Sequence, residues 1–558
     1  MCGIHISLSS STQTISPHLE KCLRNRGPDF LGKERRPVSD VWSLSFTSTV
    51  LALRGDHVTR QPLTDPTNGS VLCWNGEAWR ISGRQVEGND GEAILDLLMK
   101  ASALPHSRRE DILNAFRAIE GPFAFVYYDE PSKSLFFGRD RLGRRSLMFR
   151  HDDAPGAITL CSIPESCDPS WKEVEADGIY RLDCSMNSQP ARDDWLPHGR
   201  DDFVSLLSNL LSQVSSIGSF NTSLPSSKPA LTSSSSAVGA LREQLLKSLR
   251  LRVLNIPKPP SLEISSSSRV AILFSGGLDC TVLARLVHEL LDEGQGIDLI
   301  NVAFENPRVV AQLEKEAGGK PVNFYEACPD RVTGRKSLAE LKRVCPGRPF
   351  RFLAVNVPYS ETLAHRDQVI SLIHPHNTEM DLSIAYALYF AARGEGLTSA
   401  RDISLGDEEE LHTSQARVLL SGLGADELFG GYGRHAVAFS RLGYPGLIDE
   451  LLLDVSRLSK RNLGRDDRVM AHWGKEVRFP YLDECLVRWA METPAWDKCD
   501  FDNGEDISGV EAGKRVLRLL ALELGMGGVA KEKKRAIQFG ARTAKMESGR
   551  VKGTALIS

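Results

Sequence analysis

The sequence predicts two domains of different fold class, an α+β domain followed by an α/β domain with a doubly wound parallel sheet. Up to about residue 190, short strand patterns such as 71–74 and 123–128 are separated by Gly, Pro, Asn and Asp turns. A Ser-rich stretch lies between about 205 and 240. From residue 269 onward, strand and helix patterns alternate, as they do when helices cover both faces of a parallel sheet.

These patterns divide the chain into a first domain over 2–190, a linker over 191–236 and a second domain over 237–545. The linker is expected to be flexible, because Ser-rich segments bury little apolar surface. Helical apolar spacing over 237–254 predicts a helix that packs on the second domain. The apolar run 270–274 predicts a strand of that domain.

The composition excludes several classes of protein. At 558 residues the chain is too long for one apolar core, and its 41% hydrophobic and 25% charged residues are ordinary for a soluble protein. A net charge of −4 predicts no nucleic-acid partner, and no apolar run approaches the ~20 residues of a membrane span. Eleven cysteines without a CxxC pair and a polar start predict a cytosolic protein without a targeting peptide. The sequence leaves open whether the chain forms a homodimer.

Cys2 becomes the first residue once Met1 is trimmed, and trimming is expected because cysteine is small. The mature chain then carries a thiol beside a free α-amine. An α-amine titrates near ~7.7–8.0, so part of it is neutral at cell pH and accepts the thiol proton. The pair predicts a self-contained nucleophile and base, although a cysteine at position 2 is by itself as readily a chance occurrence.

Four short motifs follow Cys2 and supply groups that hydrolysis of an amino-acid amide needs. They are Arg26-Gly27-Pro28-Asp29, Arg54 within 51–55, Asn75-Gly76-Glu77 and Asp90-Gly91-Glu92. Arg54 offers a planar fork to an α-carboxylate, and Asp90 can hold an α-ammonium. The Asn75 side chain and the Gly76 N–H can form an oxyanion hole. Each motif has a plain alternative, since Asn-Gly is a common hairpin turn and Arg54 alone fits a surface charge.

In the second domain, Ser275-Gly276-Gly277-Leu278-Asp279 joins a strand of Val, Ile and Leu to a helix. Consecutive glycines at such a junction let backbone N–H groups face an anion, and the helix N-terminus adds its dipole. Ser-Gly-Gly alone is usually a plain loop, but this position with an acidic residue inside it predicts a pyrophosphate loop. Asp279 is then a candidate ligand of Mg²⁺.

On these motifs and on the run 138–143, the first domain resembles the class II, N-terminal-nucleophile (Ntn) glutamine amidotransferases. Within them it is similar to the glutaminase domain of the asparagine synthetases. The resemblance implies an αββα-layered fold in which Cys2 attacks the glutamine carboxamide and forms a thioester. Ammonia leaves, and water resolves the thioester. The residues that would bind glutamine or its oxyanion are Arg54, Asn75, Gly76, Glu77 and Asp90.

The second domain resembles the PP-loop ATP pyrophosphatase domain of the same family, which cleaves ATP to AMP and PPi while it adenylates a carboxylate. The motifs that carry this resemblance are 273–280, 420–432 and 511–518, and 478–483 fits a further element that is expected to be structural. The resemblance implies ATP and Mg²⁺, with Asp279 and Asp426 as the metal ligands. The implied ATP and PPi contacts are Leu273, Ser275, Gly276, Gly277, Asp279, Ser421, Gly422 and Lys514.

The second site departs from the family pattern at several positions. Leu423 stands where asparagine synthetases carry a Glu thought to steer ammonia or take its proton, and general-base help is typically worth ~10²–10⁴-fold. Cys280 replaces a Ser, so a hydroxyl becomes a weak thiol donor. The segment 330–337 is polar and basic where the family differs. Together with 535–540, these departures resemble a eukaryotic branch of the family, the asparagine synthetase domain-containing proteins.

The sequence therefore predicts a glutamine-hydrolysing, asparagine synthase-like enzyme. Ammonia released through Cys2 would be transferred to ATP-adenylated aspartate, giving asparagine, glutamate, AMP and PPi. The partners are then the small molecules glutamine, aspartate and ATP. Two alternatives stay open. Leu423 favours a pseudo-synthetase that binds nucleotide as a regulatory or interaction protein, and 330–351 favours an amidotransferase for a different carboxylate.

Overall fold

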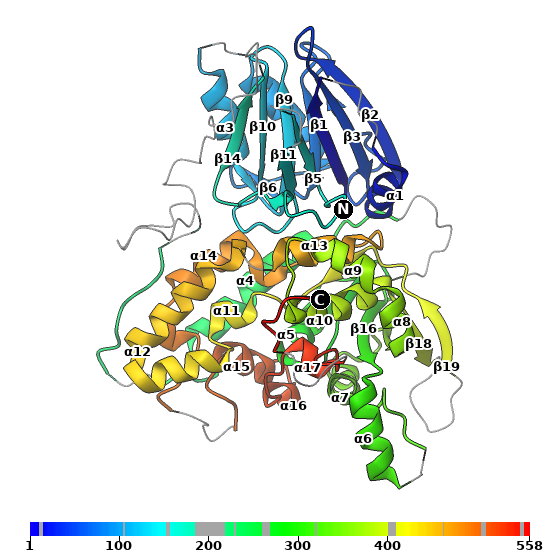
Figure 1. Cartoon of the computed structure of the whole chain (residues 1–558). Coiled ribbons are helices and arrows are strands. Elements are labelled where there is room, and N and C mark those ends of the chain that lie inside the picture. The colour runs from blue at the N-terminus through cyan, green and yellow to red at the C-terminus, as the bar shows by residue number, and fades with distance from the viewer. Residues whose placement is uncertain are drawn as a thin grey trace.

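Two antiparallel β-sheets lie face to face in the N-terminal domain of the computed structural model (Figure 1). One consists of β13 (Lys172–Glu173), β11 (Met148–His151), β12 (Ile158–Cys161), β1 (Gly3–Ser9), β3 (Ser43–Val50) and β2 (Phe30–Pro37), in that order. The other consists of β14 (Ile179–Asp183), β10 (Ser134–Arg139), β9 (Phe123–Asp129), β5 (Val71–Gly76) and β4 (Leu63–Thr64). Ile4 and Ile6 of β1 share a buried core with Val71 and Val126 of the facing sheet.

The structure describes residues 1–10, 15–103, 106–151, 157–184, 217, 219–227, 230–258, 268–318, 321–399, 409–460, 462–503, 509–546 and 552–557. The part of the predicted linker over 191–216 lies outside these residues. The later part contacts the second domain, because Ile217 and Leu231 are buried in its core and the Asn221 N–H donates to the Met491 carbonyl at 2.8 Å. The domain boundaries themselves stay predictions.

Helices form the outer layers of the N-terminal domain. Alternate residues of β9, such as Phe125, turn away from the core between the sheets and pack with Ile94 and Phe116 of α2 (Asp90–Ala101) and α3 (Arg108–Arg117). Helix α1 (Pro17–Arg26) contacts β1 and β3 on the opposite side. The predicted αββα layering is therefore confirmed. A small sheet of β7 (Arg84–Gln85), β6 (Arg80–Ile81) and β8 (Ile119–Glu120) completes the domain.

A seven-stranded sheet lies at the centre of the C-terminal domain. Its order is β19 (Glu409–Thr413), β18 (Glu395–Ser399), β17 (Phe350–Val357), β16 (Ile297–Phe304), β15 (Val270–Leu273), β20 (Val418–Leu420) and β21 (Glu476–Arg478). Five neighbouring strands of this sheet are parallel, as predicted, namely β17, β16, β15, β20 and β21. At the other edge, β18 and β19 form an antiparallel hairpin. The edge differs from the expected parallel sheet. Four of the five residues of β19 are exposed, and an antiparallel edge strand of this kind needs no covering helix.

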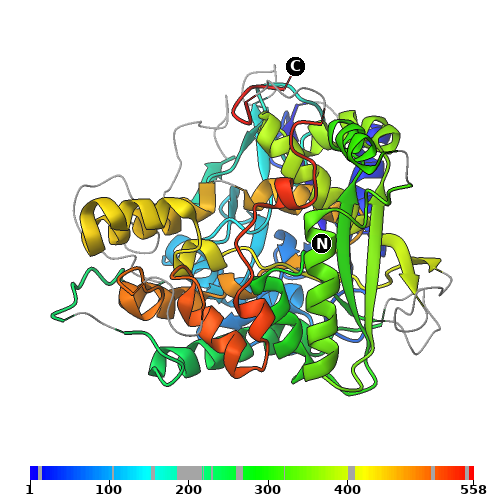
Figure 2. The same cartoon turned by 90° about the horizontal axis from the view of Figure 1, so that it is seen from below.

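Helices surround this sheet, as Figure 2 shows from below. They are α4 (Ser236–Val253), α5 (Leu278–His288), α6 (Pro307–Ala317), α7 (Pro329–Val344), α8 (Tyr359–Ala364), α9 (Arg366–Ile373), α10 (Glu379–Arg393), α11 (Ala425–Phe429), α12 (Gly433–Ser456), α13 (Leu463–Ala471), α14 (Glu484–Glu492), α15 (Arg515–Glu523), α16 (Gly527–Ala530) and α17 (Ile537–Gly540). Helix α4 contacts α5, α14 and α15, which confirms the helix predicted over 237–254 and its packing on this domain. Strand β15 confirms the strand predicted over 270–274.

Buried charges join the two domains. Arg26 of α1 donates to the Asp467 carboxylate of α13 at 2.9 Å. Arg145, which precedes β11, lies 3.8 Å from the same carboxylate and 3.3 Å from Glu476 of β21. These four side chains are almost inaccessible to solvent. Because a buried charge is stable only when it is paired, these contacts hold the domains in one relative position. An apolar core that includes Leu23 and Met470 crosses the same interface.

We predict that Asp467→Ala strongly destabilises the chain, because it leaves the buried Arg26 guanidinium without its carboxylate and Arg145 with Glu476 alone. The expected loss is about 3–5 kcal/mol in the free energy of unfolding, measured by urea denaturation. The control is Glu110→Ala, which breaks the ion pair of Arg117 with a carboxylate that is 61% exposed. That substitution should cost about 1 kcal/mol or less. Equal midpoints for the two variants would contradict the role given to Asp467.

Candidate active sites

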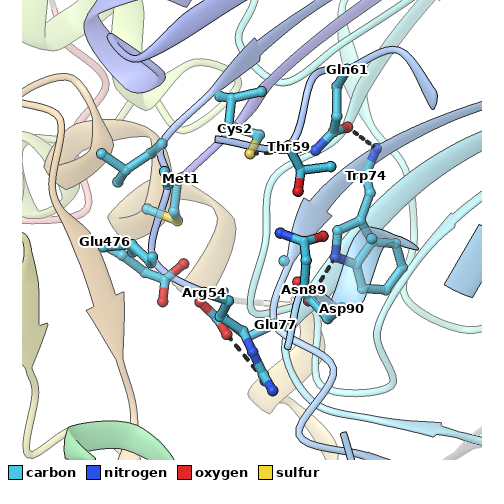
Figure 3. A pocket seen from close by; sticks show the side chains of 16 residues that line it. Met1, Cys2, Arg54, Thr59, Gln61, Trp74, Glu77, Asn89, Asp90 and Glu476 are labelled. Atoms are coloured by element: carbon cyan, nitrogen blue, oxygen red, sulfur yellow. Dashed lines mark hydrogen bonds and ion pairs between the residues drawn. The ribbon is translucent and has the colours of Figure 1, made fainter. Parts of the chain in front are cut away.

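A cavity opens around Cys2 at the start of β1, and residues of both domains line it (Figure 3). The Cys2 side chain is nearly buried. Gln61 donates from Nε2 to the Cys2 sulfur at 3.7 Å, and its Oε1 accepts from the Trp74 N–H at 2.8 Å. Strand β5 thus holds an amide donor beside the thiol. The sequence analysis missed Gln61, since no local motif marks it.

Asp90 lies on the wall of this cavity, at the first residue of α2. Its Oδ2 accepts from the Trp74 indole N–H at 3.0 Å and from the Ala78 N–H at 2.8 Å. These two hydrogen bonds fix the carboxylate, and neither of them involves Oδ1. Burial raises the pKa of Asp90, with Arg54 and the two hydrogen bonds acting against it. A buried carboxylate in this position suits a cationic group such as an α-ammonium.

Arg54 also lines the cavity, but its donors are already engaged. Its guanidinium donates to the carbonyls of Ala78 at 3.0 Å and Gly88 at 3.3 Å, and it lies 3.5 Å from Glu77. Through these hydrogen bonds the Arg54 side chain holds the segment that follows β5 in place. The prediction that Arg54 binds the carboxylate of glutamine is therefore not tested by these contacts, and it stays a prediction.

The other predicted residues of the first site lie at the end of β5. Gly76 and Glu77 line the cavity, whereas Asn75 does not. Within the described residues, neither atom of the buried Asn75 amide has a hydrogen-bond partner. Glu77 accepts from Arg478 of the second domain at 2.8 Å. The structure therefore gathers Gly76, Glu77 and Asp90 around Cys2 and leaves the Asn75 amide unpaired behind them.

Met1 and Glu476 occupy the side of the cavity that faces the second domain (Figure 3). Met1 is only 2% exposed, and burial lowers the pKa of its α-amine to about 5. Burial also raises the pKa of the Cys2 thiol. While Met1 is attached, the thiol is thus protonated at neutral pH. Glu476 was missed in the sequence, although it comes two residues before the run 478–483.

The second candidate site lies where two neighbouring parallel strands end. Strands β15 and β20 are hydrogen-bonded neighbours, so the loops that follow them meet at one edge of the sheet. Gly276 has a φ of 80°, and a Cβ there would lie 2.5 Å from the backbone of Gly334, so only glycine fits. The Gly277 N–H donates to Ser275 Oγ at 3.3 Å, and a Cβ on Gly422 would lie 2.9 Å from Asp279. The structure thus brings the two predicted loops into contact.

Lys514 lies between the two predicted metal ligands. Its Nζ is 2.8 Å from an oxygen of Asp279 and 2.8 Å from an oxygen of Asp426, and Lys534 also pairs with Asp426. Burial alone would lower the pKa of Lys514, but the two carboxylates outweigh it and raise that pKa above its usual range. The ammonium is therefore permanently charged and faces the phosphate loop.

A cavity rich in cations opens beside this cluster. Ser275, Gly277, Asp279 and Lys514 line it, whereas Leu273, Gly276, Ser421, Gly422 and Asp426 do not. Five cationic side chains line the cavity, which suits a polyphosphate. They are Lys514, Arg518, Lys533, Lys534 and Arg535. Arg518, Asp330 and Thr333 were not predicted as site residues. Arg518 ends the motif 511–518, whereas Asp330 and Thr333 lie outside the recognised motifs.

The donor set fits the predicted Mg²⁺, which is usually bound by one or two carboxylates together with substrate phosphates. Asp279 and Asp426 supply two carboxylates at one ammonium. Over the described residues, no group of three or more His, Cys, Asp or Glu side chains is arranged to hold a metal ion. Water and substrate phosphates would supply the other ligands, as is usual for Mg²⁺.

The two departures from the family motif are placed differently. The Cys280 thiol donates to the Gly277 carbonyl at 3.4 Å, so it supports the loop from within. Leu423 packs against the apolar core of the domain, and its N–H donates to Ser421 Oγ at 3.3 Å. Neither side chain lines the cavity.

Each half of the chain matches a known protein family. Residues 1–179 match the glutamine amidotransferase domain family, and residues 408–449 and 442–552 match the asparagine synthase family. Asparagine synthetase domain-containing protein 1 of Bos taurus is 33% identical over 99% of this chain and 97% of its own length. The chain belongs to the asparagine synthetase domain-containing protein 1 family. The Homo sapiens member is 32% identical over 98% of this chain and 96% of its own length.

The predicted resemblance to the asparagine synthetase domain-containing protein 1 family is thereby confirmed. A relative named asparagine synthetase [glutamine-hydrolyzing] 1, from Saccharomyces cerevisiae, is 22% identical over 88% of this chain and 76% of its own length. None of the helices in the described ranges has both the length and the apolar character that crossing a bilayer requires.

We predict that Met1 suppresses the reactivity of Cys2. A raised thiol pKa leaves little thiolate at neutral pH, so iodoacetamide should alkylate the Met1-bearing chain slowly. The processed chain has an α-amine beside the thiol and should react roughly tenfold faster or more. Pulsed alkylation at pH 7 with mass spectrometry of the N-terminal peptide measures this difference. The exposed Cys167 serves as an internal control, and equal rates at Cys2 in both forms would refute the prediction.

Proposed function

We propose that the protein is a glutamine-hydrolysing, asparagine synthase-like ligase that uses ATP and Mg²⁺. Glutamine is hydrolysed at Cys2, and the ammonia is transferred to aspartate that the second domain has adenylated. The products are asparagine, glutamate, AMP and PPi. One observation carries the proposal, namely that strand β21 contacts both the Cys2 cavity and the predicted nucleotide loop that follows β20. Its Glu476 lines the Cys2 cavity, and the carbonyl of its Arg478 accepts the Ser421 N–H at 3.0 Å.

In the first half of the proposed reaction, the α-amine of the processed Cys2 takes the thiol proton. The thiolate attacks the carboxamide carbon of glutamine, and Gln61 and the Gly76 N–H, which line the cavity, would donate to the oxyanion. Asp90 would hold the α-ammonium of glutamine. The C–N bond breaks, ammonia leaves with the transferred proton, and water hydrolyses the thioester to glutamate.

In the second half, an aspartate carboxylate attacks the α-phosphorus of ATP, and pyrophosphate leaves. Lys514 and the N–H groups of the loop 275–277 would bind the charge that develops on the leaving group. Mg²⁺ held by Asp279 and Asp426 would supply further charge neutralisation at the phosphates. Ammonia then displaces AMP from the acyl adenylate.

A second candidate keeps the glutaminase but changes the later step. Leu423 is half-buried against the apolar core and cannot accept a proton. This observation favours a pseudo-synthetase that binds nucleotide without amination, as a regulatory or interaction protein. The segment 330–351 favours an amidotransferase for another carboxylate. The cytosol stays the proposed compartment, supported by eleven unpaired cysteines, and a homodimer stays an untested prediction.

We expect labelled asparagine when the protein is incubated with amide-¹⁵N glutamine, aspartate and MgATP, with one AMP formed for each asparagine. Cys2→Ala should reduce label transfer by about 10³-fold or more, because it removes the nucleophile. The same variant should still make asparagine from ammonium chloride. Mass spectrometry of the products measures both results. Hydrolysed glutamine beside unconverted aspartate would exclude the proposed ligase reaction.

We expect Leu423→Glu to raise the rate of asparagine formation, because it restores a proton acceptor whose help is typically worth ~10²–10⁴-fold. Leu423→Gln is the matched control, since it has nearly the same shape without a carboxylate. Pyrophosphate release should be similar in both variants, and thermal melting checks that the substitution at this half-buried position is tolerated. If the two variants form asparagine equally fast, Leu423 does not limit the amination step.

A further inference from the structure

Two segments that depart from the asparagine synthetase pattern, 330–337 and 535–540, meet at the phosphate cavity. They lie about two hundred positions apart in the chain, yet Asp330 and Arg535 line the same cavity. A Cβ on Gly540 would lie 2.1 Å from each carboxylate oxygen of Asp330. The C-terminal segment therefore closes directly over this carboxylate, and only glycine leaves room for it.

Asp330 is held rigidly at the start of α7. Its neighbour Arg331 is buried and donates to the side chains of Asn301 at 2.7 Å and Asn356 at 2.8 Å. Asn301 in turn donates to the carbonyl of Asp330 at 2.9 Å and to that of Phe274 at 2.8 Å. Because Phe274 immediately precedes the phosphate loop, this network fixes Asp330 relative to that loop.

The rest of the segment packs on the loop itself. The Ser337 hydroxyl donates to the Gly276 carbonyl at 2.6 Å, and Gly334 touches the Gly276 backbone. Helix α7 is thus part of the wall of the phosphate site. The segment 330–337 therefore belongs to the second site, although the motifs of the family do not include it.

The Asp330 side chain is only 10% exposed, and its carboxylate forms a loose ion pair with Arg535 Nη1 at 3.5 Å. Arg535 also donates to Thr333 Oγ1 at 3.4 Å, and its side chain is 36% exposed. Burial raises the pKa of Asp330 to about 7, while Arg535 and Lys534 act against that rise. A closer cationic partner would compensate this cost.

A carboxylate next to a guanidinium is complementary to one common chemical group, the head of an α-amino acid. There the ammonium and the carboxylate sit on one carbon, so both can form charge-assisted hydrogen bonds with such a pair. A phosphate group would be repelled by the carboxylate, and the cavity offers it Lys514 and Lys534 instead. A ribose hydroxyl has no need of the guanidinium.

We propose that Asp330 and Arg535 bind the head group of an α-amino-acid acceptor, with Asp330 on its ammonium and Arg535 on its α-carboxylate. The proposal rests on the proposed function, because it assigns the acceptor of the ATP-dependent step. The side-chain carboxylate of the acceptor then points toward the phosphate loop and Lys514. The segments 330–337 and 535–540 thus define which class of carboxylate is activated.

Calorimetric binding to the full chain tests this proposal, with a nonhydrolysable ATP analogue and Mg²⁺ present. The probes are L-aspartate and L-glutamate. Each is compared with the dicarboxylate that lacks its ammonium, which is succinate for aspartate and glutarate for glutamate. We expect at least one amino acid to bind more tightly than its analogue, by roughly 10- to 100-fold. Asp330→Asn should remove this preference and leave the affinity for the nucleotide analogue unchanged.

Two further variants sharpen the test. Arg535→Ala should weaken the binding of amino acid and analogue alike, since both carry a carboxylate. Lys336→Ala removes an exposed cation from the same helix and should change neither affinity.

Three results would overturn the proposal. They are an Asp330→Asn variant with wild-type preference, an Asp330→Asn variant that loses nucleotide instead, and a wild-type chain without any preference for the ammonium. This assay needs neither Cys2 nor turnover. If the chain binds an amino acid selectively but forms no ¹⁵N-labelled amide, the ligase reaction is rejected. The assignment of Asp330 and Arg535 as the amino-acid-binding pair is still supported.

Discussion

The rest of the structure depends on one buried carboxylate, Asp467, which lies between Arg26 and Arg145. Taking such ions out of water costs several kcal/mol each, and the cost is offset only when every charge finds its partner. Because both arginines belong to the first domain and Asp467 to the second, this requirement selects one docking geometry. In this geometry Glu476, the other partner of Arg145, lies in the wall of the Cys2 cavity.

The second site uses charge in a different way. Asp279 and Asp426 would repel each other at close range, and the ammonium of Lys514 allows them to stand together. The loops after β15 and β20 are consequently held in contact before any ligand is present. A polyphosphate would meet groups that are already oriented, which avoids reorganisation when charge develops.

Contiguous motifs made much of this molecule predictable. The loop 275–279 and its flanking strand and helix follow from residues that are neighbours in the chain. Gln61 and Asp330 escaped prediction, since each reaches its site from a remote part of the sequence without a local pattern. The prediction that Arg54 binds glutamine stays untested, but its contacts with carbonyls of the segment 78–88 could not be foreseen. Where that segment runs is a property of the tertiary fold, which no spacing in the sequence encodes.

The contact between Gly276 and Gly334 has a consequence for how this sequence can diverge. A side chain at Gly276 would overlap the backbone of α7, and one at Gly334 would meet the Asn301 amide at 2.8 Å. Asn301 holds both Phe274 and Asp330, so one substitution would disturb the shared loop and the divergent segment together. Substitutions in the segment 330–337 are therefore structurally constrained by the phosphate loop on which that segment packs.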